Sequence, residues 1–117
     1  MKPVFPACGL ALIANLALAQ TPVVTLADAK DHVGQLVTIE GTVSEVHHAA
    51  SGKATFIDMG GRYPNNPFAG VIFPDDASKF SDVDSLSGKV VDITGRVKLY
   101  REAPEVILND PSQIKAK

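Results

Sequence analysis

The chain has 117 residues and a formal net charge of −2, which allows one domain and excludes two. Its single cysteine excludes an intramolecular disulfide, so the fold must rely on its hydrophobic core. The small acidic excess argues against a protein that binds duplex DNA through an overall basic charge. Any contact with a polyanion must therefore come from a local basic patch.

The first 19 residues have the pattern of a secretory signal peptide. Lys2 supplies the positive start, an apolar run follows over residues 4–18, and Ala-Leu-Ala at 17–19 is a sequence that signal peptidase accepts. A membrane anchor is one alternative, but a run of about 15 residues is shorter than the roughly 20 that a spanning helix needs. A lipoprotein anchor through Cys8 is another, although the residues before Cys8 lack the usual leucine. We predict cleavage before Gln20 and a periplasmic or secreted protein with no stable membrane span after cleavage.

Cleavage of residues 1–19 would leave residues 20–117 as a single domain. This mature chain would carry 10 basic and 13 acidic residues, a net charge of −3, because Lys2 leaves with the signal peptide. It would also lose Cys8, which excludes a thiolate metal site and a cysteine nucleophile.

The first element predicted in the mature chain is a helix of about two turns that ends before residue 34. Thr25 can cap its N-terminus, and Asp28 follows three residues later in a short-armed capping box. Gly34 stands where a left-handed backbone conformation commonly ends a helix.

Two segments, 34–43 and 88–97, repeat one pattern and predict two long strands. Each begins with glycine and a polar residue, and then alternates apolar and polar residues around a central glycine, Gly41 or Gly95. Such alternation buries one face of a strand, as in a closed antiparallel barrel, and the central glycine suggests a sharp bend. Two ordinary sandwich strands with incidental glycines are the alternative. The predicted core faces are Val37, Ile39, Gly41 and Val43 on the first strand, and Val91, Ile93, Gly95, Val97 and Leu99 on the second.

Three shorter strands and a second helix complete the prediction. The strands cover residues 54–59, 68–73 and 105–108, the helix covers 75–80, and an irregular loop covers 60–67. Phe56, Phe68 and Phe73 stand among aliphatic residues and are assigned to the core. The order predicts an all-β fold: a five-stranded OB-type Greek-key barrel with a short N-terminal helix and a short helix between strands 3 and 4.

The two repeated segments, the sequence Thr55-Phe56-Ile57-Asp58 and the closing segments 100–108 and 111–114 carry a resemblance. Over residues 33–114 the chain resembles the OB-fold domains of the nucleic-acid-binding superfamily, in particular small exported bacterial members. Relatives commonly have glycine where this chain has Glu102 or Ala103, which predicts a wider last hairpin. The resemblance implies a binding module, and OB barrels host oligonucleotides, oligosaccharides, peptides and metals.

Ligands of OB barrels usually cross the outer face of the second and third strands, between the loop joining strands 1 and 2 and the loop joining strands 4 and 5. The candidate ligand-binding residues near this face are Lys53, Arg62, Tyr63, Arg96, Lys98, Tyr100 and Arg101. They predict binding of single-stranded nucleic acid or another anionic oligomer through base stacking and phosphate pairing. Each group of residues also has an interpretation without a ligand. Arg96, Lys98 and Tyr100 would then form an ordinary solvated strand face, and Arg62 and Tyr63 would belong to a stiff loop that only closes the end of the barrel.

Neither a metal site nor an enzyme is predicted. His47 and His48 are neighbours on a strand and point to opposite faces, so Glu45 or Asp58 would have to complete a metal shell. The sequence has no recognisable nucleophile signature, phosphate loop or HExxH helix, so we expect no catalytic activity and no cofactor. The alternatives to nucleic-acid binding are a periplasmic protein-interaction or envelope-stress module, and a carrier of a metal or small ligand.

Overall fold

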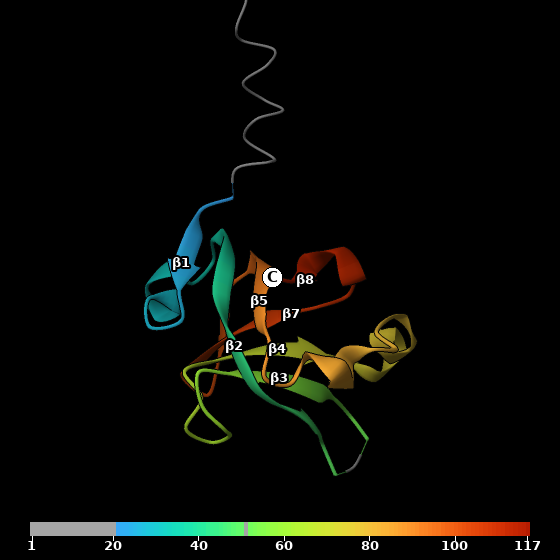
Figure 1. The fold of residues 1–117 in the computed structure, drawn as a ribbon. Coiled ribbons are helices and arrows are strands. Elements are labelled where there is room, and N and C mark those ends of the chain that lie inside the picture. The colour runs from blue at the N-terminus through green and yellow to red at the C-terminus, as the bar shows by residue number, and fades with distance from the viewer. Residues whose placement is uncertain (1–20, 51) are drawn as a thin grey trace, which may run out of the picture.

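The computed structural model describes residues 21–50 and 52–117, which form eight strands and short 3-10 turns (Figure 1). The strands are β1 (Val23–Thr25), β2 (Leu36–His48), β3 (Thr55–Met59), β4 (Phe68–Ile72), β5 (Val90–Arg96), β6 (Lys98–Tyr100), β7 (Ala103–Ile107) and β8 (Ile114–Ala116). The predicted signal peptide lies outside these residues. Within them, no helix has the length and apolar character needed to cross a membrane.

All the strands belong to one sheet, in the order β6-β7-β4-β3-β2-β5-β8, with β1 paired to β2. The β4–β7 and β1–β2 pairs are parallel, and the other pairs are antiparallel. The mostly-β, OB-like architecture is therefore confirmed. The predicted number of strands is wrong, because the described residues form eight strands rather than five. The hydrogen-bonded path is also open at β6 and β8 rather than closed.

The predicted fourth strand divides in two because the chain changes its pairing partner at Val97. β5 pairs with β2 as far as Arg96, and the Val97 backbone N–H donates to the Gln35 carbonyl at 3.1 Å. β6 then pairs with β7 instead. This change leaves Leu99 47% exposed, so its assignment to the buried face is wrong. The other two additional strands, β1 and β8, are three residues long, too short for an alternating pattern to reveal them.

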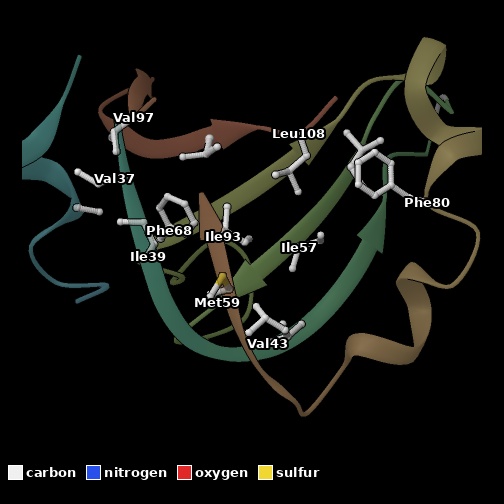
Figure 2. Packing of buried hydrophobic residues seen from close by; sticks show 14 residues of the cluster. Val37, Ile39, Val43, Ile57, Met59, Phe68, Phe80, Ile93, Val97 and Leu108 are labelled. Carbon is white, nitrogen blue, oxygen red and sulfur yellow. The ribbon is translucent and has the colours of Figure 1, made fainter. Parts of the chain in front are cut away.

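β2 serves both halves of the sheet because it is long and bent, as Figure 2 shows. Its first part pairs with β5 and its second part with β3. Between Val43 and Glu45 the register shifts at a β-bulge, and a bulge adds one residue to one strand. The bulge therefore inverts the alternation: Val43 is buried in the core, whereas Glu45 and His47 lie on the outer face, and Val46 packs against the core instead.

The core consists of the alternating residues predicted for the two long strands, joined by residues of β3, β4 and the C-terminal segment (Figure 2). The valines and isoleucines of the two predicted faces are at most 1% exposed: Val37, Ile39, Val43, Val91, Ile93 and Val97. Each central glycine allows a close contact. A Cβ atom at Gly41 would meet Leu26 at 2.7 Å, and one at Gly95 would collide with Val106. The absence of a side chain at these positions lets neighbouring segments pack onto the bent sheet.

The three phenylalanines assigned to the core differ in burial. Phe68 is 1% exposed and is the largest fully buried side chain. Phe73 follows β4 immediately before Pro74 and is 44% exposed. Phe56 is half-buried and stacks against His47 on the outer face of the sheet. The core assignment is therefore confirmed for Phe68 and wrong for the other two.

The two predicted helices are short 3-10 helices: η2 (Ala29–His32) before β2 and η3 (Pro74–Lys79) after β4. Two further 3-10 helices were not predicted: η4 (Val83–Leu86) and η5 (Pro111–Gln113). Thr25 belongs to β1, although its hydroxyl accepts a hydrogen bond from the Asp28 backbone N–H at 3.3 Å. Gly34 has a φ of +87°, the left-handed conformation expected at the end of the predicted helix. The helix itself is shorter: Thr25, its predicted cap, is the last residue of β1, residues 26–28 form a turn, and only Ala29–His32 is helical.

Candidate functional site

A groove of about 420 Å³ crosses the outer face of β3 and β4 and is here called the aromatic groove. Residues from the β2–β3 loop border one end, and the β6–β7 hairpin borders the other. Its lining residues are His47, Ala49, Ala50, Phe56, Asp58, Tyr63, Pro64, Asn66, Ala69, Tyr100, Arg101, Ala103, Pro104 and Glu105. In an OB fold, these two loops and this face are the usual ligand-binding surface.

Three rings form a continuous wall of the aromatic groove. His47 on β2 and Phe56 on β3 are directly paired across the strands, and their rings stack with centroids 5.1 Å apart and planes inclined by 22°. The Tyr63 ring, from the loop between β3 and β4, lies 5.4 Å from the His47 ring. Tyr63 is 66% exposed, so most of its surface is free for a further ring to stack on it.

The opposite wall of the groove is a tight hairpin that carries one ring and one cation. Tyr100 pairs with Ala103, so Arg101 and Glu102 alone form the turn, with φ values of +52° and +68°. The prediction of a wider last hairpin is therefore wrong: the chain adopts the left-handed turn without a glycine. The Arg101 guanidinium carbon lies 5.3 Å from the centroid of the Tyr100 ring, which is a cation–π contact.

Asp58 forms the buried floor beside the ring wall. Its side chain is 1% exposed, its Oδ2 lies 3.2 Å from His47 Nδ1, and its Oδ1 accepts a hydrogen bond from Asn66 Nδ2 at 3.3 Å. Burial raises the pKa of Asp58, and the hydrogen bond and charge of His47 act in the opposite direction. Asn66 also donates to the Phe68 carbonyl at 3.2 Å, which fixes the loop over β4.

The structure places the seven candidate ligand-binding residues in different surroundings. Tyr63, Tyr100 and Arg101 line the aromatic groove. Arg62 stands next to Tyr63 with its Nε 3.9 Å from Glu45 Oε1, and Lys98 is paired with Glu105 across the β6–β7 hairpin. Neither of these two lines the groove, and neither do the last two candidates. Lys53 is exposed in the β2–β3 loop, and the Arg96 guanidinium donates to the Gly34 carbonyl at 2.6 Å.

Sequence reasoning missed the part that Phe56, Asn66 and Glu105 play in lining the groove. Phe56 was assigned to the core, because alternation alone does not show which face of β3 is covered by other elements. Asn66 and Glu105 reach the groove through the fold of the long loop and the parallel pairing of β4 with β7. No local pattern encodes either of these long-range contacts.

A second hollow, of about 610 Å³, lies between β1 and β8 on the outer side of β2 and β5. It is lined by Thr21, Val23, Thr38, Asp92, Thr94, Ser112, Gln113 and Lys115. These side chains include several hydrogen-bonding groups but no aromatic ring, so a nucleobase has nothing to stack on there. The aromatic groove is therefore the better candidate for a nucleic-acid site.

Glu105 provides a test of the electrostatics of the groove. Burial raises its pKa, and the charge of Lys98 lowers it by a smaller amount. Because the folded-state pKa is raised, the contribution of Glu105 to stability is full below its unfolded-state pKa and is lost as the pH rises through the folded-state pKa. Glu105→Gln should therefore have a higher Tm than the wild type at about pH 7, and the difference should shrink toward about pH 4.

The measurement is thermal denaturation followed by circular dichroism at both pH values. Glu102→Gln, at the exposed turn of the same hairpin, is the matched control and should change the Tm little at either pH. A stabilisation by Glu105→Gln that grows on acidification would contradict the prediction.

No protein-family model matches the sequence, and no curated protein matches it either. Solved structures do match its fold. The chain superimposes on the aspartyl-tRNA synthetase of Entamoeba histolytica with a TM-score of 0.58 and 16% identity, over 86% of this chain and 22% of the synthetase. The S. pombe Stn1–Ten1 complex matches with a TM-score of 0.52 and 18% identity, over 70% of this chain and 57% of the matched chain.

A lipoprotein from Klebsiella pneumoniae that is named for nucleic-acid binding matches along almost its whole length. Its TM-score is 0.51 at 17% identity, over 88% of this chain and 97% of the lipoprotein. The chain thus spans about a fifth of the matched synthetase but nearly all of this small protein. At these identities the likeness is one of fold. The OB-like fold predicted from the sequence is confirmed.

Proposed function

We propose that this protein is a non-enzymatic binding module that holds single-stranded nucleic acid in the aromatic groove. The observation that carries the proposal is the arrangement of the rings at the usual OB ligand surface. His47, Phe56 and Tyr63 form one wall, and Tyr100 forms the other, beside Arg101. Exposed rings on opposite sides of a groove suit unpaired bases, which stack on aromatic faces and need no partner strand.

The charges around the groove indicate that base stacking contributes more to the binding free energy than the pairing of phosphates with cations. Asp58 and Glu105 line the groove, and Glu45 stands beside it, so phosphates meet carboxylates as well as cations. The bordering segments offer four cations, Lys53, Arg62, Lys98 and Arg101. With at most four phosphate contacts, the logarithm of the binding constant should fall with the logarithm of salt concentration with a slope no steeper than about −3.

The experiment is a fluorescence anisotropy titration of a labelled single-stranded oligonucleotide with the chain from Gln20 onward, which contains every described strand. We expect saturable binding to the single strand, weaker binding to a duplex of the same sequence, and a shallow salt slope. Equal or tighter binding to the duplex would contradict stacking of unpaired bases. No binding at low salt up to about 50 μM protein, a concentration within the roughly 1–100 μM range of non-specific complexes at physiological salt, would reject the nucleic-acid proposal.

Docking of a protein partner is the alternative that a negative result would favour. The S. pombe structure similar to this chain is itself a complex, of Stn1 with Ten1. The exposed side chains of Leu99 and Tyr100 on β6 would suit such a contact. Pairwise binding to envelope proteins would then be the next measurement.

We further propose that the protein acts in the periplasm or outside the cell. The support is the signal-peptide pattern of residues 1–19 and the likeness in fold and size to the Klebsiella pneumoniae lipoprotein.

A further inference from the structure

Three potential metal ligands converge where the bulged end of β2 meets β3. Glu45 and His47 are two residues apart on β2 and share its outer face, and Asp58 of β3 is paired directly with Glu45. One ligand atom from each of the three side chains lies within 4.8 Å of the other two. We call this set the Glu45–His47–Asp58 cluster.

The cluster brings two carboxylates together under unfavourable conditions. Directly opposed like charges destabilise an antiparallel pair, and Asp58 is 1% exposed, so water does not screen its charge. Within residues 21–50 and 52–117, the one permanently charged group paired with these carboxylates is Arg62, which is 77% exposed and has its Nε 3.9 Å from Glu45 Oε1. A divalent cation between the two carboxylates would compensate both charges.

One distance within the cluster matches a coordination shell. His47 Nδ1 and Asp58 Oδ2 are 3.2 Å apart. Two ligands on one zinc ion, each with a bond of about 2.0–2.1 Å, are roughly 3.4 Å apart in a tetrahedron. Asn66 holds the other oxygen of Asp58 at 3.3 Å, the kind of outer contact that orients a ligating carboxylate. Small side-chain movements would bring Glu45 into the same shell.

We propose that Glu45, His47 and Asp58 bind one divalent transition-metal ion, with Zn²⁺ as the first candidate. One imidazole nitrogen and two carboxylate oxygens suit zinc, whereas magnesium favours oxygen ligands and retains its water. His47 and Asp58 line the aromatic groove, so an ion held by them would lie beside it. The inference concerns the metal alone and does not depend on the ligand proposed for the groove.

His48 provides the matched control. It is the next residue on β2, points to the other face and is hydrogen-bonded to Thr55 at 3.1 Å and to Asp84 at 2.8 Å. It therefore differs from His47 in position but not in chemistry. Zinc that binds at random to surface histidines would not distinguish the two residues.

The test is isothermal titration calorimetry of the chain from Gln20 onward with zinc chloride, in the absence of any oligonucleotide. We expect one ion per chain, no comparable heat from magnesium chloride, and losses of affinity of at least about 10-fold in Glu45→Gln and in His47→Gln. His48→Gln should bind zinc like the wild type. Thermal melts of each variant without zinc show whether the fold is retained. Because the Glu45 side chain is partly exposed, we expect Glu45→Gln to disturb the fold little.

Two results would overturn the proposal. One is the absence of zinc binding up to about 100 μM, well above the affinity range of protein zinc sites. The other is a wrong dependence on the variants. Zinc binding would be lost in His48→Gln, or it would be as tight as in the wild type in Glu45→Gln and His47→Gln that are folded. Because no nucleic acid is present, either result leaves the nucleic-acid proposal standing, and failure of that proposal leaves the metal site standing.

Discussion

Replacing Tyr63 and Tyr100 together by alanine should weaken the binding of a single-stranded oligonucleotide by about 30-fold or more, because each stacked base contributes roughly 1–3 kcal/mol. The two rings stand on opposite sides of the aromatic groove and are 66% and 56% exposed. Their removal should therefore cost contacts with the ligand without disturbing the core. Anisotropy titrations of the double variant and of each single variant measure the effect.

Two controls make this test specific. Leu99→Ala removes an exposed apolar side chain from the residue next to Tyr100 on β6, and it should leave binding unchanged. Replacing both tyrosines by phenylalanine keeps the rings and should retain most of the affinity. If the double alanine variant binds as tightly as the wild type, stacking in this groove is rejected. If Leu99→Ala has the same effect as Tyr100→Ala, the loss reflects the hairpin and not the ring.

Phe68→Ala should destabilise the domain by about 3–5 kcal/mol, the usual cost of deleting a buried phenylalanine side chain. Phe68 is 1% exposed and lies among Val37, Ile39 and Ile93 in the view of Figure 2. The cavity left behind is bounded by a bent sheet that cannot collapse freely. For a domain of this size, such a loss should lower the Tm by more than about 10 °C.

Phe73→Ala is the matched control, since it removes the same side chain just beyond the other end of the same strand. Phe73 is 44% exposed, so its replacement should change stability by less than about 1 kcal/mol. Urea denaturation of both variants gives the comparison. Similar losses of stability in the two variants would mean that the burial of Phe68 does not determine the strength of the core.

The sequence predicted the central strands because their signal is local. The repeated alternation around Gly41 and Gly95 identifies which residues of segments 34–43 and 88–97 face the core, and the six valines and isoleucines among them are buried. The turn residues around these segments mark where the strands end. Together they were sufficient for an OB-like fold, and the solved structures confirm that likeness.

The site was only partly predictable. Tyr63, Tyr100 and Arg101 follow from knowing where OB barrels bind their ligands, and the structure brings these three residues to one groove. The bulge after Val43 was not visible in the sequence, and it alone turns Glu45 and His47 to the outer face. The floor at Asp58 and the ring pair of His47 with Phe56 depend on the register that this bulge sets.

Alternation in the sequence is sufficient to identify which residues of the two long strands face the core, because a period of two is a property of neighbouring residues. Other features depend on the tertiary structure: the change of the pairing strand from β2 to β7 at Val97, the short strands β1 and β8, and the exposure of Leu99 and Phe73. These features depend on hydrogen bonds and contacts between segments far apart in the chain, such as Val97 with Gln35. The physical reason is that pairing partners compete for the same backbone groups, and only the assembled sheet selects among them.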